Sequence, residues 1–421
     1  MLTTVLRKEH KNRWERRVAL SPTAAGKLVE NGQQLVVERS EFRVYSDSEY
    51  TDQKVELVST ANDSQLVLGI KEPPVESIQT NQVHLCFSHT IKGQDYNMPL
   101  LQRFIDARAT LIDYELMRDS QGVRTIAFGR YAGIAGAIDT FWAYGKQLYQ
   151  KGVTSAFSEF QQTWKYGSVA QAHHALKSIN LASDAKPHRI IILGSGKVGK
   201  GSAEVCEWLG LRQIQVSELY DNTYPANESW YCIIETPDLY ERIDTSGFDR
   251  DEYYQYGKER YRSRFCELLG HCDVVLLTSF WTEQFPRHME LKDFKTHVDK
   301  LPTILGDISC DIDGAFACTS KITDIDNPVY TYNPETGTSE DGLSLDGIAI
   351  MAIDNLPCEL SQDASDHFSS VLVNHIPALM ALDLSLSFDA LALEPEVKNA
   401  VIVYNGKLTP EFEYLKQYLA E

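Results

Sequence analysis

Long apolar runs are missing from this 421-residue sequence, and none approaches the ~20 residues that a membrane-spanning helix needs. Internal repeats and low-complexity tracts are also absent. The first residues, Met1–Glu9, have the pattern of a strand and not the apolar core of a secretory signal. These absences predict a globular protein of the cytoplasm, and the length leaves room for two or three domains.

Basic residues are scarce relative to acidic ones. The chain has 40 Lys and Arg against 59 Asp and Glu, which gives a formal net charge of -19. Because an acidic surface repels phosphate backbones, we expect no nucleic-acid partner. The eight cysteines form no C-x-x-C pair and no cluster with zinc-binding spacing, so we expect reduced thiols and no metal site.

A glycine turn near the middle of the chain is the strongest motif present. The β-branched run Ile190–Leu193 predicts a strand buried on both faces, and residues 202–209 have helical spacing. Between them lies a G-x-G-x-x-G sequence made of Gly194, Ser195, Gly196, Lys197, Val198 and Gly199. Strand, turn and helix in this order are typical of dinucleotide binding, because the glycines admit the pyrophosphate to the helix N-terminus. A plain tight turn is the alternative.

Two further residues are predicted on the cofactor side. Glu218 lies 19 positions after Gly199, which is the spacing of an acid that binds the adenosine ribose and favours NAD(H). This residue would follow a strand over 213–216. Thr278 closes a second buried strand over 273–278.

Residues 220–265 are charged and rich in tyrosine, and they indicate an insertion with helices that could be a lid or an oligomer contact.

The first 130 residues alternate between strand and helix patterns. We predict strands over 3–6, 34–38, 66–70, 83–87 and 110–114, and helices over 22–30 and 99–108. Ser21 is a suitable N-cap for the first helix, with Pro22 at its first position. Alternation of this kind predicts a parallel sheet with both faces covered, and thus an α/β fold.

Three titratable residues, Lys71, His89 and Glu115, each follow the end of a predicted strand. Each one alone could be an ordinary surface group. Since the carboxyl ends of parallel strands meet at one edge of a sheet, we expect the three to converge there as acid–base groups.

Arginines supply candidate contacts for carboxylates. Arg16 and Arg17 are adjacent and follow the first strand, and a guanidinium binds a carboxylate through two hydrogen bonds. A solvated basic turn is the alternative. Arg124 is predicted in or beside a strand, where its charge needs either an internal acid or a substrate carboxylate.

Several short motifs occur together in a set order along the chain. They are Trp14–Arg17, Ser88–Gln94, Asn97–Met98, Ile112–Glu115, Ala127–Gly129, Ala132–Gly136, Asp307–Ser309, Ile353–Pro357 and Asn405–Gly406. Together they resemble the lysine-ketoglutarate reductase half of aminoadipic semialdehyde synthase. This is a saccharopine dehydrogenase within the alanine dehydrogenase and transhydrogenase superfamily. The resemblance covers nearly the whole chain.

The resemblance implies two Rossmann-like domains with parallel sheets and an active site in the cleft between them. Residues 1–130 with 355–421 would form the substrate domain, and residues 131–354 the dinucleotide-binding domain. It implies reductive condensation of L-lysine with 2-oxoglutarate to saccharopine. Lys71 and His89 would be the acid–base pair, Arg17 would grip a substrate carboxylate, and Asp354 would lie near the nicotinamide.

The cofactor and the branch of the family stay open at this point. The resemblance favours NADP(H) and the saccharopine-forming reaction. Glu72 and Glu218 favour NAD(H) and either the lysine-forming enzyme or an alanine dehydrogenase-like one. A nucleotide-binding protein without catalysis is a third reading, although it would be expected to lack Lys71 or His89. Small-molecule substrates are the expected partners, with neither nucleic acid nor membrane, and a homo-oligomer is compatible with the sequence.

Overall fold

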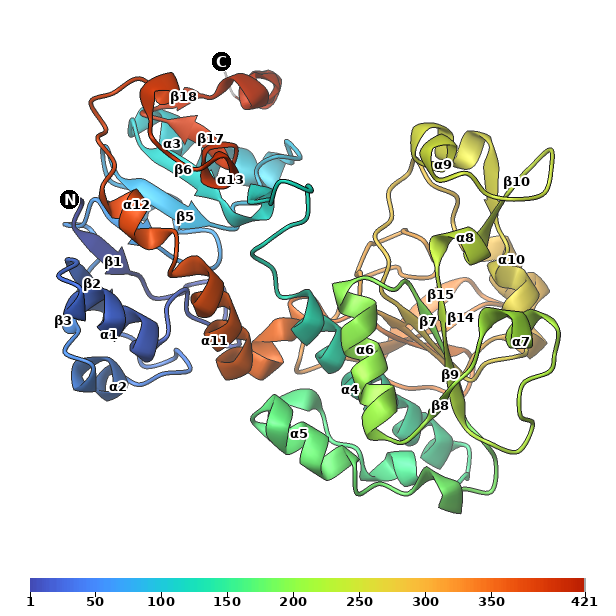
Figure 1. The fold of residues 1–421 in the computed structure, drawn as a ribbon. Coiled ribbons are helices and arrows are strands. Elements are labelled where there is room, and N and C mark those ends of the chain that lie inside the picture. Colours follow the sequence, from blue (N-terminus) through green and yellow to red (C-terminus); the bar gives the residue numbers. More distant parts are fainter. Residues whose placement is uncertain (420–421) are drawn as a thin grey trace. The chain divides into compact units, whose positions relative to one another are not determined.

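The computed structural model describes residues 1–419, which form two compact units (Figure 1). Unit 1 contains Met1–Phe128 and the C-terminal segment from Ser361, and unit 2 contains Gly129–Leu360. Each unit is built on an eight-stranded, mostly parallel sheet with helices around it, so the predicted α/β class is confirmed. The assignment of unit 1 to substrate and unit 2 to cofactor stays a prediction.

Unit 1 has the strand order β18-β17-β6-β5-β4-β1-β2-β3. Its strands are β1 (Thr4–Leu6), β2 (Leu35–Glu38), β3 (Glu56–Val58), β4 (Leu66–Leu68), β5 (Val83–Cys86), β6 (Thr110–Asp113), β17 (Val401–Tyr404) and β18 (Lys407–Leu408). Its helices are α1 (Pro22–Glu30), α2 (Asp47–Asp52), α3 (Met98–Asp106), α11 (Ser361–Leu372), α12 (Ile376–Met380) and α13 (Pro395–Lys398). Strands β1 to β6 are parallel, and β17 and β18 run antiparallel to their neighbours.

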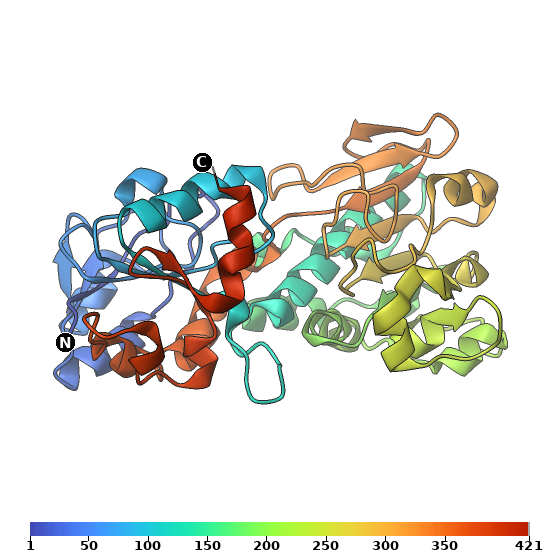
Figure 2. The same ribbon diagram turned by 90° about the horizontal axis from the view of Figure 1, so that it is seen from above.

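Local sequence signals account well for unit 1. The helix predicted over 22–30 is confirmed, and the Ser21 hydroxyl accepts a hydrogen bond from the backbone N–H of Ala24. The C-terminal segment returns to this unit, where β17 pairs with β6 (Figures 1 and 2). The predicted strands therefore form one sheet whose carboxyl ends share an edge.

Unit 2 has the strand order β15-β14-β16-β13-β12-β7-β9-β8. Its strands are β7 (Arg189–Leu193), β8 (Arg212–Gln213), β9 (Trp230–Ile234), β12 (Val274–Leu277), β13 (Ile304–Asp307), β14 (Val329–Asn333), β15 (Thr338–Asp341) and β16 (Ile348–Met351). A separate pair is made by β10 (Tyr240–Arg242) and β11 (Tyr261–Ser263). The helices are α4 (Gly129–Gln150), α5 (Val169–Leu176), α6 (Lys197–Trp208), α7 (Val216–Tyr220), α8 (Thr236–Leu239), α9 (Arg250–Tyr256) and α10 (Leu291–Thr296).

Two predictions for unit 2 are wrong. The strand predicted over 213–216 ends at Gln213, because Gln215 and Glu218 form a capping box that starts α7. The segment 220–265 is also not wholly an insertion. It contains β9, whose backbone pairs with β7 along its length and whose aromatic and branched side chains are mostly buried. Only the part after β9 is an addition to the sheet.

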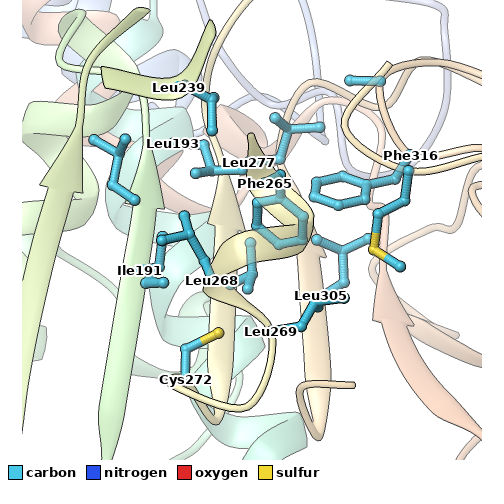
Figure 3. Packing of buried hydrophobic residues seen from close by; sticks show 14 of the residues in the cluster. Ile191, Leu193, Leu239, Phe265, Leu268, Leu269, Cys272, Leu277, Leu305 and Phe316 are labelled. Carbon is cyan, nitrogen blue, oxygen red and sulfur yellow. The ribbon is translucent and has the colours of Figure 1, made fainter. Parts of the chain in front are cut away.

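The core of unit 2 lies against the central strands β7, β12 and β13. Figure 3 shows Ile191, Leu193, Leu277 and Leu305 packed with Phe265 and neighbouring apolar side chains. On α4, a Cβ added at Gly133 would lie 1.9 Å from the Val198 carbonyl oxygen of α6. The run of small residues around Gly133 therefore permits a close crossing of two helices. Within residues 1–419, no helix is both long and apolar enough to cross a membrane.

Candidate functional site

The carboxyl edge of the unit 1 sheet carries the three titratable residues that the sequence singles out. Lys71 follows β4, His89 follows β5, and Glu115 follows β6. These strands are parallel neighbours, so their ends lie together at one edge. The structure thus brings Lys71, His89 and Glu115 to the same edge of one sheet.

A short hydrogen bond joins His89 to an acid on the neighbouring strand end. The His89 Nδ1 lies 2.5 Å from the Glu72 Oε1, and the Lys11 Nζ lies 4.0 Å from the other Glu72 oxygen. Burial acts to raise the pKa of Glu72, but the hydrogen bond and the charge of His89 outweigh it and lower this pKa to about 2. A carboxylate at Nδ1 directs the Nε2 atom of His89 away from Glu72 and makes it available for proton transfer.

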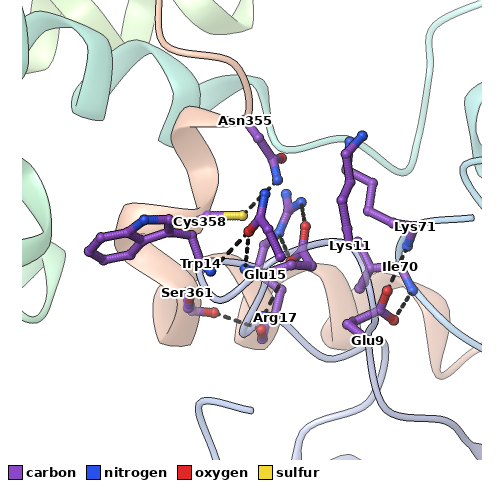
Figure 4. A network of polar contacts seen from close by, with 12 residues as sticks. Glu9, Lys11, Trp14, Glu15, Arg17, Ile70, Lys71, Asn355, Cys358 and Ser361 are labelled. Carbon is purple, nitrogen blue, oxygen red and sulfur yellow. Dashed lines mark hydrogen bonds and ion pairs between the residues drawn. The ribbon is translucent and has the colours of Figure 1, made fainter. Parts of the chain in front are cut away.

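Buried ions hold the backbone of Lys71 from both sides. The Glu9 carboxylate accepts hydrogen bonds from the N–H groups of Ile70 (2.7 Å) and Lys71 (3.1 Å), as Figure 4 shows. The Arg7 guanidinium lies 3.3 Å from Glu9 and donates to the carbonyl oxygen of Lys71. Both ionic side chains are almost fully buried. The position of Lys71 is therefore determined by an ion pair as well as by β4.

A second buried acid, Asp113 at the end of β6, fixes the other two strand ends. One of its oxygens accepts hydrogen bonds from the Ser88 hydroxyl (2.5 Å) and the Ser88 N–H (3.0 Å). The other oxygen accepts from the N–H of Glu115 at 2.8 Å. Burial raises the pKa of Asp113, while these hydrogen bonds act to lower it. The sequence pattern did not identify Glu9 or Asp113 as part of the site.

The adjacent arginines separate in the structure. Arg16 is exposed, and its Nε donates to the Phe42 carbonyl oxygen at 3.2 Å. Arg17 is 2% exposed and forms two hydrogen bonds with the Glu15 carboxylate, at 2.8 and 2.5 Å, while its guanidinium lies over the Phe128 ring. Arg17 is therefore not a solvated turn residue. Arg16 and Arg17 do not form one binding site for a carboxylate, because only Arg17 is buried. Arg17 has an internal partner that the sequence did not predict.

Arg124 pairs with an internal acid, which was one of its two expected partners. Its Nη2 donates to the Glu115 Oε1 at 2.7 Å. Arg124 lies in a loop and forms only an isolated bridge with Arg118, so the prediction of a strand there is wrong. Both partners are about one-third exposed, and the pair stays accessible to solvent.

The glycine turn of unit 2 is tightly packed at Gly199 and open at Gly196. Gly194 has a φ of 111°, and a Cβ at Gly199 would lie 2.0 Å from the Gly194 carbonyl oxygen. A Cβ at Gly196, in contrast, would meet no atom within 4 Å. Gly196 is the N-cap of α6, so open space lies beside the start of that helix. A pyrophosphate can approach the backbone at this point.

Other predicted cofactor residues differ in their surroundings. Ser195 lies in the turn, and Lys197 and Val198 form the first turn of α6. Thr278 supports the turn, since its hydroxyl donates to the carbonyl oxygen of Leu193 at 2.8 Å. Asp354 is exposed after β16, at the carboxyl edge of the same sheet.

Glu218 is not beside the glycine turn along the sheet. It belongs to the capping box of α7 and lies 3.4 Å from Arg212 on the edge strand β8. Strand β9 separates β8 from β7, because β9 pairs with both. The acid that follows the strand next to β7 is Glu235. The apolar run Trp230–Ile234 before Glu235 was the sequence signal that could have located this residue.

Profiles of known protein families match most of the chain. The alanine dehydrogenase/PNT N-terminal domain matches residues 5–135, and the alanine dehydrogenase/PNT C-terminal domain matches residues 172–411. The chain belongs to the alanine dehydrogenase/PNT family. This membership confirms the resemblance seen in the sequence motifs and the prediction of a dehydrogenase-type chain.

Curated relatives of this alanine dehydrogenase/PNT family member include alpha-aminoadipic semialdehyde synthase of Arabidopsis thaliana. It is 31% identical over 434 residues, which take in 96% of this chain and 40% of that protein. The mitochondrial alpha-aminoadipic semialdehyde synthase of Mus musculus is 28% identical over 98% of this chain and 47% of its own length. The NAD(+)-dependent, L-lysine-forming saccharopine dehydrogenase of Emericella nidulans is 24% identical, with 87% and 89% covered. The chain thus spans less than half the length of the synthases it matches.

Solved structures show the same fold at low identity. An L-alanine dehydrogenase superposes with a TM-score of 0.66 at 16% identity, with 99% of this chain and 100% of that chain covered. A transhydrogenase from Sinorhizobium meliloti gives a TM-score of 0.61 at 15% identity, with 96% and 99% covered. These likenesses establish the Rossmann-like architecture of both units.

Proposed function

We propose that the chain is an oxidoreductase that interconverts saccharopine with L-lysine and 2-oxoglutarate, using NAD(H) or NADP(H). The observation that carries the proposal is the set of strand ends in unit 1, where Lys71 and His89 lie at one sheet edge and His89 is oriented by Glu72. The relatives that share most of this chain are named for saccharopine chemistry, which supports these substrates. The resemblance alone favours NADP(H) and saccharopine formation, but the choice between NAD(H) and NADP(H) depends on the residues that contact the adenosine ribose.

The proposed reaction needs an acid and a base. The ε-amine of lysine must lose a proton before it attacks the keto carbon of 2-oxoglutarate, and the carbinolamine must then be protonated so that water leaves. The resulting imine is reduced by the hydride that the nicotinamide cofactor supplies when bound. Lys71 and His89 are the residues that would accept and donate these protons. Glu72 holds His89 through Nδ1 and so leaves Nε2 for the transfer.

Substrate carboxylates need cations near the acid–base residues. Lys11, 4.0 Å from Glu72, and Arg124, hydrogen-bonded to Glu115, lie around the same sheet edge. Arg17 is paired with Glu15 through two hydrogen bonds, so its proposed role is to bind a substrate carboxylate as a member of this ion pair. Orientation of two charged substrates by such groups supplies much of the rate acceleration.

The residues of the glycine turn fit a dinucleotide. Gly194 and Gly199 permit the tight path of the chain, and the space at Gly196 receives the pyrophosphate at the start of α6. A Cβ at Gly196 would occupy that space. Thr278 keeps the turn in place through its hydrogen bond to Leu193.

Initial rates test the proposal directly. Purified protein is given lysine with 2-oxoglutarate, or pyruvate with ammonia, and each pair is tested with NADH and NADPH. We expect turnover with lysine and 2-oxoglutarate, and saccharopine as the product by mass spectrometry. A strong rate with pyruvate and ammonia alone would contradict the proposal and favour alanine dehydrogenase-like chemistry. Cofactor binding without turnover on either pair would favour the non-catalytic reading.

A further inference from the structure

We propose that Glu235, and not Glu218, binds the adenosine ribose and makes the chain selective for NAD(H) over NADP(H). We base this on the position of Glu235, which follows β9 and lines the same cavity as the glycine turn. The inference rests on the proposed function only in that unit 2 binds a nicotinamide dinucleotide.

Strand order places Glu235 next to the turn. In dinucleotide-binding sheets, the acid that contacts the ribose follows the strand adjacent to the one that leads into the glycine turn. Here that adjacent strand is β9, which pairs in parallel with β7 from Arg189 to Leu193. The N–H of Gly194 donates to the carbonyl oxygen of Ile234 at 2.9 Å, so the residue before Glu235 is hydrogen-bonded to the turn itself.

A cavity of about 260 Å³ joins Glu235 to the turn. Gly194 and Ser195 line one part of it, and Glu235 and Thr236 line another. Its volume is just below the ~300 Å³ at which ligand pockets begin, so it suits one moiety of a dinucleotide and not the whole. Since the pyrophosphate would lie at Gly196, the moiety next to Glu235 is the adenosine.

The segment after β9 supplies the remaining wall of this cavity. Phe248, Arg250 and Tyr254 come from α9 and the loop before it, and they also line the cavity. The Arg250 guanidinium lies over the Tyr254 ring, 5.9 Å from its centre. An aromatic ring and a guanidinium both offer a flat surface to a purine, so this part of residues 236–263 serves adenine binding.

Charge decides between the two cofactors. The Glu235 carboxylate can accept hydrogen bonds from the ribose hydroxyls of NAD(H), but it repels the 2′-phosphate of NADP(H). Arg250 has the opposite sign and would attract a phosphate. Both side chains line the cavity, but Arg250 lies over the Tyr254 ring in the added segment, whereas Glu235 directly follows β9 next to the turn, so we assign the ribose contact to Glu235.

Binding of adenosine fragments tests the inference without any turnover. Isothermal titration calorimetry is used to measure ADP-ribose and 2′-phospho-ADP-ribose against the full chain and the variants Glu235→Gln, Arg250→Ala and Glu218→Gln. We expect wild-type protein to bind ADP-ribose at least about tenfold more tightly than the phosphorylated probe. Glu235→Gln should reduce this ratio at least about tenfold, since the like charge is removed.

The other two variants are matched controls. Arg250→Ala should weaken both probes to a similar degree, because adenine is common to them, and Glu218→Gln should change neither affinity. Wild-type protein that binds neither probe, or that prefers the phosphorylated one, would overturn the inference. The same holds if Glu218→Gln alters the ratio and Glu235→Gln does not. Failure of the lysine reaction with an intact ADP-ribose preference would instead reject only the proposed substrates.

Discussion

The carboxyl edges of the two sheets are built in different ways. In unit 1, buried charged side chains form hydrogen bonds with the backbone after the strands. Glu9 and Arg7 bind the backbone of Lys71, and Asp113 binds the N–H groups of Ser88 and Glu115. In unit 2, the part of the edge that follows β7 is shaped by glycines and backbone atoms around Gly194, whereas Asp307 at the end of β13 is a buried acid that accepts hydrogen bonds from Ser309, Cys310 and Thr319. The difference indicates that the ends of β4, β5 and β6 are organised to hold ionisable groups at set positions, and the end of β7 to keep space for a ligand.

Burial makes the unit 1 arrangement costly. It raises the pKa of Glu9, because an ionised carboxylate is disfavoured away from water, while the nearby Arg7 lowers it. Structures seldom keep fully buried acids unless hydrogen bonds and countercharges stabilise them. The presence of the buried acids Glu9 and Asp113 next to the segments of Lys71 and His89 is therefore a reason to regard this edge as a functional site.

The largest effect is expected in unit 2, where a side chain at Gly199 has no room. Gly199→Val should abolish measurable NADH binding and lower the melting temperature, because its Cβ would lie 2.0 Å from the Gly194 carbonyl oxygen. Fluorescence titration and thermal melts measure both effects. Gly196→Ala is the matched control: its Cβ meets no atom of the protein within 4 Å, so it should fold normally yet bind NADH more weakly. Native binding in both variants would show that the turn does not receive the cofactor.

In unit 1, loss of an acid–base group should affect turnover and spare binding. Lys71→Met and His89→Gln should each reduce kcat by roughly a hundredfold or more, with cofactor affinity nearly intact. Steady-state rates and NADH titrations separate the two quantities. Lys27→Met, on an exposed position of α1, is the control lysine and should behave as wild type. Undiminished activity of both site variants would remove these residues from the chemistry.

A smaller effect is expected from the buried acid that positions Lys71. Glu9→Gln replaces one of the two accepting oxygens by an NH2 group, so either the N–H of Ile70 or the N–H of Lys71 loses its acceptor, and the loss should destabilise the fold by ~1–3 kcal/mol. If Glu9 positions Lys71, kcat should fall about tenfold and its pH profile should shift, with little change in KM. Glu56→Gln on exposed β3 is the control. A loss of stability without a shifted pH profile would make Glu9 purely structural.

The smallest effect concerns two buried acids of unit 2, Asp139 and Glu359. The two carboxyl groups interact, and one oxygen of each, Asp139 Oδ2 and Glu359 Oε1, has no other hydrogen-bond partner within the described residues, so we infer that the pair shares a proton. Burial, together with the neighbouring Asp139, raises the pKa of Glu359 well above its usual range. Burial also raises the pKa of Asp139 to about 6, although its hydrogen bonds to Glu359 and Thr163 act in the other direction.

The sign of the resulting pH dependence follows from these raised values. The folded chain binds the shared proton more tightly than the unfolded chain, so stability is full below the ordinary carboxyl pKa and falls as the pH rises through the raised one. Thermal melts between about pH 5 and about pH 8 should show this decline. In Glu359→Gln, the melting temperature should fall less over this pH range, by a few degrees, since the amide donates a hydrogen bond without a titrating proton. An unchanged slope would show that the pair does not share a proton.

Much of the fold was predictable from local signals. Ser21 and Pro22 predict the start of α1, and the run from Ile190 predicts β7, because capping and side-chain periodicity act over a few residues. The strand-end positions of Lys71 and His89 followed from the alternation of strands and helices. The edge strand β8 and its neighbour β9 were not predicted correctly, since β8 has two residues and β9 is embedded in charged sequence.

By itself, the sequence determined the α/β class, the glycine turn and the residues at the ends of the unit 1 strands, because each depends on neighbouring residues. Only the tertiary structure decided that β9 lies beside β7, which moves the expected ribose contact from Glu218 to Glu235. It also decided that Glu9 holds Lys71 and that Glu15 pairs with Arg17. Strand order and partners of buried charges depend on packing between residues far apart in the chain, and sequence spacing carries little information about it.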